Sequence, residues 1–79
     1  MALVTTEKML KDAQAGHYAV GAFNVENLEF VMAVLAAAEE TKSPVIMQTT
    51  PGTITAAGLE GFSGLVTAAA ERASVPVAV

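Results

Sequence analysis

Cysteine and tryptophan are absent from this 79-residue sequence, and aromatic residues make up only 5% of it. Without cysteine the chain can form neither a disulfide nor a thiolate metal site, so nothing in it indicates an oxidising compartment. We therefore expect a cytoplasmic protein. Apolar residues amount to 53% of the sequence and are mostly alanine and valine, which bury little area each.

Positive charge and long apolar runs are also scarce. The fixed cations are Lys8, Lys11, Lys42 and Arg72, against a formal net charge of −4. They form no basic stripe that could neutralise a run of phosphates, so we expect no nucleic-acid partner. The longest apolar run, residues 30–38, is far below the roughly 18 to 20 residues that span a bilayer, so we expect no membrane partner.

The first helix is expected near the N-terminus. Thr5 or Thr6 can cap a helix that runs to about Ala15, because a threonine side chain accepts hydrogen bonds from the first turn. Gly16 follows and can provide the left-handed residue that ends it. His17, the single histidine of the sequence, has no second imidazole or thiolate to share a zinc ion with, so we expect a surface or packing role.

Residues 28 to about 41 have the pattern of an amphipathic helix. Asn24 or Asn27 can cap it. Its apolar positions follow the i, i+3, i+4, i+7 spacing of one helix face. They are Leu28, Val31, Met32 and Leu35, with Glu29, Glu39, Glu40 and Lys42 on or near the opposite face.

A third helix is expected over residues 59–73, where Gly61 and Gly64 weaken it by roughly 1 kcal/mol each relative to alanine. We expect these two glycines to allow close packing of the helix against a sheet. The short sequence "PGT" before it, residues 51–53, is typical of a turn.

Three apolar runs predict strands: "YAVGAFN" (18–24), "VIMQTT" (45–50) and "VPVAV" (75–79). None alternates apolar with polar residues, which is typical of parallel strands covered on both faces. Strands that start near residues 19, 45 and 76 and alternate with helices predict β-α-β units of an α/β fold.

Two architectures use such units, the open doubly wound sheet and the eight-stranded barrel. Both need more strands than this chain supplies, so we expect residues 1–79 to be a single partial domain. The chain on its own would expose unpaired strand edges, and we expect it to aggregate or to be partly disordered.

Polar side chains follow the apolar part of the first two strands. Because side chains alternate between the faces of a strand, Asn24 shares a face with the apolar residues two and four positions earlier, and Gln48 and Thr50 share a face in the second strand. Ligands of parallel α/β folds bind at the carboxyl ends of the strands, so these three are candidate substrate-binding residues. The alternative is that they are ordinary turn and cap residues, and none is suited to act as a general acid, base or nucleophile.

Three sequence markers in register, "YAVGAFNV", "SPVIMQT" and "ASVPVAV", resemble the N-terminal third of the class II, zinc-dependent ketose-bisphosphate aldolases. The resemblance covers essentially the whole chain. It implies a (β/α)8 TIM barrel, of which residues 1–79 supply the first strands and helices. It also implies a lyase of carbohydrate metabolism and glycolysis, which reversibly cleaves fructose or tagatose 1,6-bisphosphate to dihydroxyacetone phosphate and glyceraldehyde 3-phosphate.

The resemblance further implies Zn²⁺, which polarises the substrate ketone, and a monovalent cation site. The zinc histidines and the catalytic aspartate of the family lie beyond residue 79, so we expect no catalytic and no metal-binding residue within this chain and no activity of the chain alone. The parent enzyme would be a homo-oligomer, a dimer or tetramer, acting on a phosphorylated ketose. The alternative is a non-catalytic β/α scaffold or a subunit-interface fragment.

Site residues follow from the same resemblance. Asn24 matches the asparagine that reaches the substrate at the end of the first strand, and Gln48 and Thr50 match a Gln-x-Ser stretch whose serine contacts the distal phosphate. Thr50 departs from serine by a methyl group. The turn "TPGT" (50–53) is closer to the tagatose type and "VGAFNVENLEF" (20–30) to the fructose type, so the choice of substrate stays open.

Overall fold

The computed structural model describes residues 3–79 as a small parallel sheet with helices on one face. Along the chain the elements are α1 (Thr6–Gly16), β1 (Gly21–Asn24), α2 (Leu28–Thr41), β2 (Val45–Gln48), α3 (Pro51–Ala57), α4 (Leu59–Glu71) and β3 (Val77–Ala78). The sheet order is β1-β2-β3 and both strand pairs are parallel. This confirms the predicted α/β class and the alternation of strand and helix.

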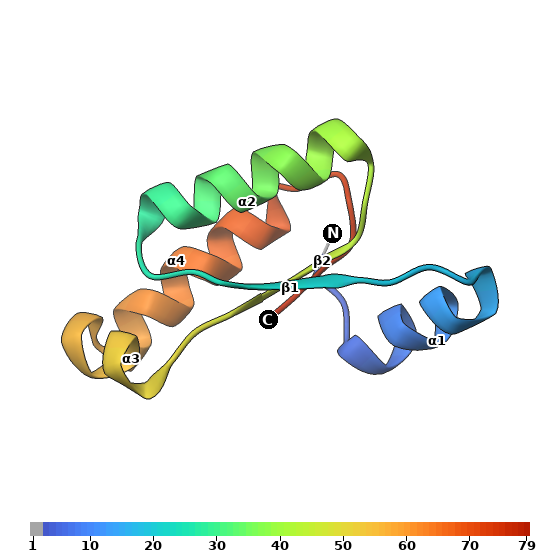
Figure 1. Cartoon of the computed structure of the whole chain (residues 1–79). Helices are drawn as coiled ribbons and strands as arrows, with labels where there is room; N and C mark the ends of the chain where they lie inside the picture. Colours follow the sequence, from blue (N-terminus) through green and yellow to red (C-terminus); the bar gives the residue numbers. More distant parts are fainter. Residues whose placement is uncertain (1–2) are drawn as a thin grey trace.

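Helices α2 and α4 pack against each other on the same face of the sheet (Figure 1). The core lies between them and the strands, and its largest fully buried side chains are Val25, Val31, Met47, Val66 and Val77. Helix α1 lies away from α2 and α4, beyond the N-terminal end of β1, and α3 lies past the C-terminal end of β2 (Figure 1). No helix within residues 3–79 has the length and apolarity that crossing a membrane would require.

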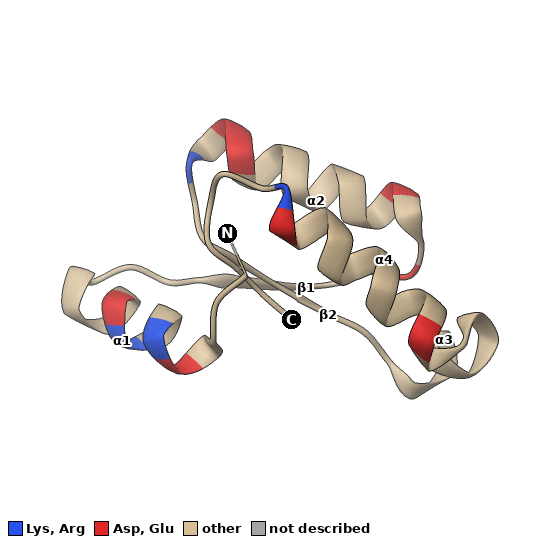
Figure 2. Ribbon diagram, turned by 180° about the vertical axis from the view of Figure 1, so that it is seen from behind, with Lys and Arg blue, Asp and Glu red and all other residues tan. Residues whose placement is uncertain are grey.

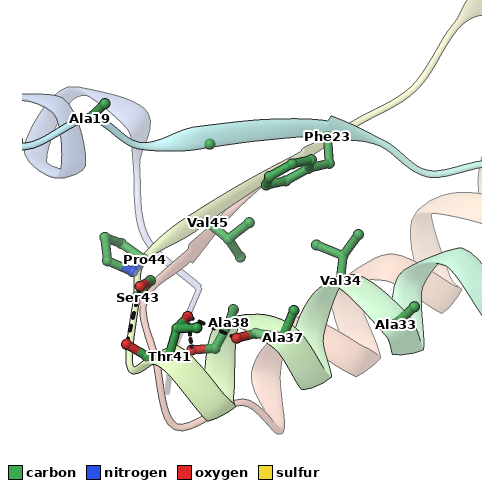
Figure 3. Close-up of a pocket in the computed structure, with 11 residues that line it drawn as sticks. Ala19, Phe23, Ala33, Val34, Ala37, Ala38, Thr41, Ser43, Pro44 and Val45 are labelled. Carbon is green, nitrogen blue, oxygen red and sulfur yellow. Dashed lines mark hydrogen bonds between the residues drawn. The ribbon is translucent and has the colours of Figure 1, made fainter.

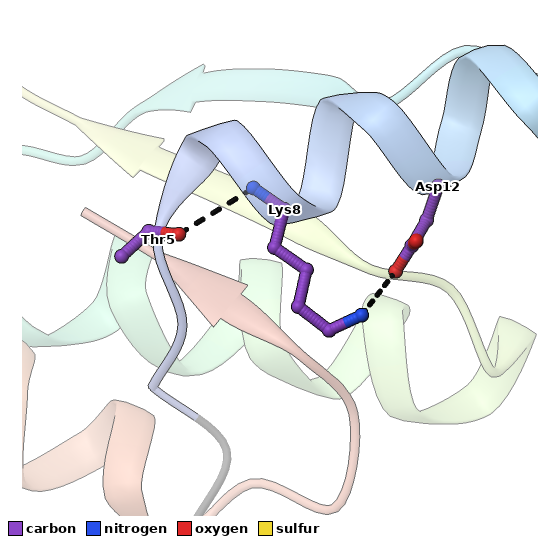
Figure 4. A network of polar contacts seen from close by, with 3 residues as sticks. All are labelled: Thr5, Lys8 and Asp12. Atoms are coloured by element: carbon purple, nitrogen blue, oxygen red, sulfur yellow. Dashed lines mark hydrogen bonds and ion pairs between the residues drawn. The ribbon is translucent and has the colours of Figure 1, made fainter.

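Capping side chains set the start of the first two helices. Thr5 is the N-cap of α1, its Oγ1 accepting from the backbone N–H of Lys8 at 3.4 Å (Figure 4). The Lys8 Nζ to Asp12 Oδ2 ion pair, at 3.0 Å, lies on the solvent side of the same helix, where such pairs contribute about 0.3–0.5 kcal/mol. Asn27, rather than Asn24, caps α2 by accepting from the N–H of Phe30 at 3.0 Å.

The end of α1 differs from the prediction. The left-handed residue is His17, with φ 61°, and Gly16 is still helical. The chain turns there because the N–H of Tyr18 bonds the carbonyl of Ala13 at 3.0 Å, which closes the last turn. A Cβ at position 16 would lie 2.6 Å from the ring of Tyr18, which is half exposed and would have to move aside.

Strand β1 is not buried, contrary to the prediction for "YAVGAFN". All four of its residues are exposed, and Phe23 keeps 50% of its accessible surface. The reason is its position at the edge of the sheet, with α2 covering only part of one face. The prediction holds for β3, in which the successive residues Val77 and Ala78 are both buried, and in part for β2, where Val45 and Met47 are buried.

Two further predictions were wrong. The "PGT" sequence begins the helix α3 instead of forming a turn, because Thr50 caps it and Pro51 fits the first helical position, where no N–H is needed. Gly61 and Gly64 do not pack against the sheet, since a Cβ at either position would meet nothing within 4 Å.

The amphipathic helix lies over Leu28–Thr41 as predicted, but its buried face is rotated. Val31 and Ala38 are buried, while Leu28 and Met32 remain 46% and 60% exposed. Glu39 remains in contact with solvent, and its carboxylate accepts hydrogen bonds from the backbone N–H and hydroxyl of Ser74. The Ser74 hydroxyl, followed by its N–H, lowers the pKa of Glu39 below the ordinary value.

Candidate functional site

The carboxyl ends of β1 and β2 bring two of the candidate residues together. Asn24 and Gln48 are register partners in the parallel ladder. The Nε2 group of Gln48 donates to Oδ1 of Asn24 at 2.8 Å, and both side chains are exposed. The backbone continues the pairing by one step, because the N–H of Val25 donates to the Gln48 carbonyl at 2.8 Å. The strand ends thus present one joined amide pair.

The amide pair has a defined polarity. The bond uses Oδ1 of Asn24 as acceptor and one N–H of Gln48 as donor. The Nδ2 group of Asn24 keeps its two protons, and Oε1 of Gln48 keeps its lone pairs. Such a pair can donate to one oxygen of a sugar and accept from a neighbouring hydroxyl, but it cannot transfer protons at neutral pH.

Thr50 does not join this pair. Strand β2 ends at Gln48, and Thr50 is the N-cap of α3, where its Oγ1 accepts from the N–H of Thr53 at 3.4 Å. The two threonine hydroxyls are 3.3 Å apart, and the hydroxyl of Thr53 donates to Oε2 of Glu26. Thr50 therefore belongs to a second polar group, which we call the Glu26–Thr53–Thr50 chain.

Sequence reasoning missed Glu26 and Thr53. Glu26 lies two residues after Asn24, as Thr50 lies two residues after Gln48, so both follow the strand ends by the same interval. Thr53 is 9% exposed and is the buried polar side chain of the described residues. The T-x-x-T sequence around Pro51 could have indicated Thr53. In a helix capped by Thr50, this spacing places the Thr53 hydroxyl at the third helical position, next to the cap.

An apolar hollow lies between β1 and α2, away from the polar side chains at the strand ends (Figure 3). Its volume is about 460 Å³, and Phe23, Val34 and Val45 face it. Its hydroxyl groups bond the backbone: Thr41 Oγ1 donates to the carbonyl of Ala37 at 2.8 Å, and Ser43 Oγ donates to that of Thr41 at 3.2 Å. The hollow offers apolar contact and no group suited to acid–base or nucleophilic chemistry.

No three His, Cys, Asp or Glu side chains within residues 3–79 come together in a way that could hold a metal ion. His17 is exposed at the end of α1. The donor set of these residues does not fit a zinc site, so we derive no catalytic step through a metal from them.

Parallel strands, helices on one face and a polar pair at the strand ends define an α/β protein of the kind that binds ligands at the carboxyl edge of its sheet. Residues 4–79 match the family described as fructose-bisphosphate aldolase class-II. The chain belongs to this family.

A solved structure supports the assignment. The YdjI aldolase from Escherichia coli K12 is 41% identical to this chain, with a TM-score of 0.87. The match covers 95% of this chain and 29% of that one, so the chain spans less than a third of the length of its structural relative. The aldolase resemblance read from the sequence is therefore confirmed.

Proposed function

We propose that this chain is the N-terminal β/α portion of a (β/α)8 barrel, and that the complete enzyme is a zinc-dependent class II aldolase that cleaves a phosphorylated ketose. Membership of the family and the parallel β-α order support the barrel. The proposal keeps residues 1–79 as one partial domain and the parent enzyme as a cytoplasmic homo-oligomer, a dimer or tetramer. Fructose and tagatose bisphosphates are the substrate classes that the resemblance implies.

The observation that carries the proposal is the Asn24–Gln48 amide pair at the ends of two neighbouring strands. Asn24 would donate from Nδ2 to an oxygen of the bound ketose, and Gln48 would hold Asn24 in that orientation while accepting from a substrate hydroxyl. Because the partner strand fixes the amide in place, less side-chain freedom is lost on binding. The role of this segment is to bind and orient the substrate.

Substitution of Asn24 in the complete enzyme tests this role. Asn24→Ala removes the donor and should lower kcat/KM for the phosphorylated ketose by roughly 10- to 100-fold, the loss of one or two oriented hydrogen bonds. Metal content and Tm should stay close to those of the parent, because the side chain is exposed. Unaltered turnover with a large loss of stability would favour the cap-residue or scaffold alternative.

The metal dependence is tested separately. Chelation should abolish cleavage by the complete enzyme and added zinc should restore it, since zinc supplies the Lewis acid in this class of enzyme. Activity that survives the chelator, together with a lysine adduct trapped by borohydride, would refute the zinc mechanism. The 79-residue chain alone should neither bind zinc tightly nor cleave the sugar.

A further inference from the structure

Two side-chain contacts join the chain segments that follow β1 and β2. The first is the Asn24–Gln48 amide pair, at 2.8 Å. The second is the hydrogen bond that the Thr53 hydroxyl on α3 donates to the Glu26 carboxylate, in the loop after β1. Asn24 and Glu26 flank Val25, which is fully buried and donates its N–H to the Gln48 carbonyl. The chain is therefore held at three successive residues where β1 ends.

Helix α3 depends on the second contact for its position. Its seven residues are too few for a helix that is stable by itself, so α3 needs contacts with other elements. It packs against α4, from which Gly58, with φ 86°, separates it. Within residues 3–79, the hydrogen bond from Thr53 to Glu26 is the one that joins α3 to the loop after β1. Its loss would free α3 to move relative to β1.

Thr50 moves with α3 because it is the N-cap of that helix. Its Oγ1 accepts from the Thr53 N–H at 3.4 Å and lies 3.3 Å from the Thr53 hydroxyl. The Glu26–Thr53–Thr50 chain thus connects the loop after β1 to a candidate substrate-binding residue. Its three side chains line one shallow hollow of about 340 Å³ beyond the strand ends.

The Glu26 carboxylate serves as a hydrogen-bond acceptor in this arrangement. Both ion pairs within residues 3–79 are on α1, and the other Lys and Arg side chains lie at the ends of α2 and α4 that are away from α3 (Figure 2). A hydrogen bond to an ionised carboxylate is roughly twice as strong as one between neutral groups. Thr53 is 9% exposed, so water competes little for its hydroxyl. Glu26 is thus suited to hold Thr53 in one position.

We infer that Glu26 is a positioning residue of the substrate site. By accepting the Thr53 hydroxyl it holds α3, and with it Thr50, at a fixed distance from Asn24. The inference rests on the proposed function, in which the ketose binds at these strand ends. It adds a residue that acts on the site through Thr53 and Thr50.

Kinetics of the complete enzyme test the inference, with fructose 1,6-bisphosphate or tagatose 1,6-bisphosphate, whichever the unmodified enzyme cleaves faster. Glu26→Ala removes the acceptor and should raise KM roughly tenfold with kcat nearly unchanged, because displaced binding groups weaken binding of the ground state and the transition state alike. Tm and metal content should stay close to those of the parent, since the Glu26 side chain is exposed.

Two variants separate positioning from an effect of charge. Glu26→Gln keeps an acceptor oxygen for the Thr53 hydroxyl and removes the charge, so it should return KM most of the way to the parent value. Glu29→Ala removes a carboxylate three residues further along, in the first turn of α2 and outside the hollow, and should leave KM unchanged.

A double variant tests whether Glu26 acts through Thr53. Thr53→Val removes the hydroxyl, so in Glu26→Ala/Thr53→Val both changes break the same contact. KM of the double variant should exceed that of Glu26→Ala by less than about twofold, whereas independent effects would multiply. If the buried Thr53 variant does not fold, Glu26→Ala and Glu26→Gln still decide the question.

The outcomes are separable. An unchanged KM in Glu26→Ala, or effects that multiply in the double variant, would overturn the inference and leave the aldolase proposal intact. So would a Glu26→Gln variant as impaired as Glu26→Ala, which would assign the effect to charge, or a loss of kcat and Tm at constant KM, which would indicate a structural role. Cleavage of neither bisphosphate by the unmodified enzyme would refute the proposed function itself.

Discussion

Two glycines in the middle of α4 provide a direct test of how this helix is stabilised. Gly61 and Gly64 are exposed, and a Cβ at either position would meet nothing within 4 Å. Substitution by alanine therefore adds no clash and restricts the unfolded chain, so both variants should be more stable than the parent.

The expected gain differs between the two positions. Gly64 is in the helix interior, where alanine is favoured over glycine by about 1 kcal/mol. Gly61 is in the first turn, where fewer backbone hydrogen bonds depend on the residue, and roughly 0.5 kcal/mol is expected. Each methyl group would project into open space, so the double variant should gain about 1.5 kcal/mol. In the complete enzyme, at about 2–4 °C per kcal/mol for a longer chain, this raises Tm by roughly 3–6 °C.

Gly58→Ala is the control for these variants. Gly58 has a φ of 86° between α3 and α4, a conformation that an L-residue adopts only with strain, so this substitution should cost about 1–3 kcal/mol although open space surrounds the residue. Thermal unfolding of the complete enzyme by circular dichroism measures all four variants. A decrease of Tm in Gly64→Ala, or no loss in Gly58→Ala, would refute the reasoning.

Three further predictions concern single contacts. Asn27→Ala removes the cap that holds the Phe30 N–H and should cost about 1 kcal/mol in urea unfolding, with Asn27→Asp largely retaining it. Thr49→Val should leave stability unchanged or raise it by up to about 1 kcal/mol, because the buried Thr49 hydroxyl has no hydrogen-bond partner within the described residues; a clear loss would mean that the hydroxyl is satisfied. The pKa of Glu39 is lowered by Ser74, so this contact stabilises the fold fully above the ordinary value of 4.5 and is lost as pH falls through the lowered pKa. Ser74→Ala removes the hydroxyl and keeps the backbone N–H, so it should reduce that acid sensitivity, measured by urea unfolding from about pH 7 to about pH 3.

Local sequence patterns predicted most of the helices and strands. They did not predict features, such as the burial of a strand, that depend on the neighbouring elements. The spacing of Val31 and Leu35 located α2, and the continuous apolar runs located the strands. The same runs could not show that β1 would be an edge strand, so Phe23 was expected inside and is half exposed. Burial of a strand depends on which elements flank it, and a single strand sequence does not carry that information.

The candidate site was predictable in part for the same reason. Strand alternation placed Asn24 and Gln48 on corresponding positions, and the parallel register joins them. Strand alternation does not apply to Thr50, because β2 ends two residues earlier. Thr50 instead caps α3, a helix that was not predicted because the "PGT" sequence is typical of a turn. Glu26 and Thr53 are far apart in sequence and meet only through the packing of α3 against the loop after β1.

The backbone contact between Leu3 and Val77 places the first described residue beside the last strand. Leu3 forms a parallel bridge with Val77, and the Val4 N–H donates to the Val77 carbonyl at 2.8 Å. Nearly the whole chain separates the two partners, so this contact closes the largest loop in the segment. During synthesis, Leu3 leaves the ribosome well before its sheet partner Val77. The backbone groups of Leu3 and Val4 therefore have no sheet partner until β3 has been synthesised. Completion of the sheet is thus coupled to the order of translation.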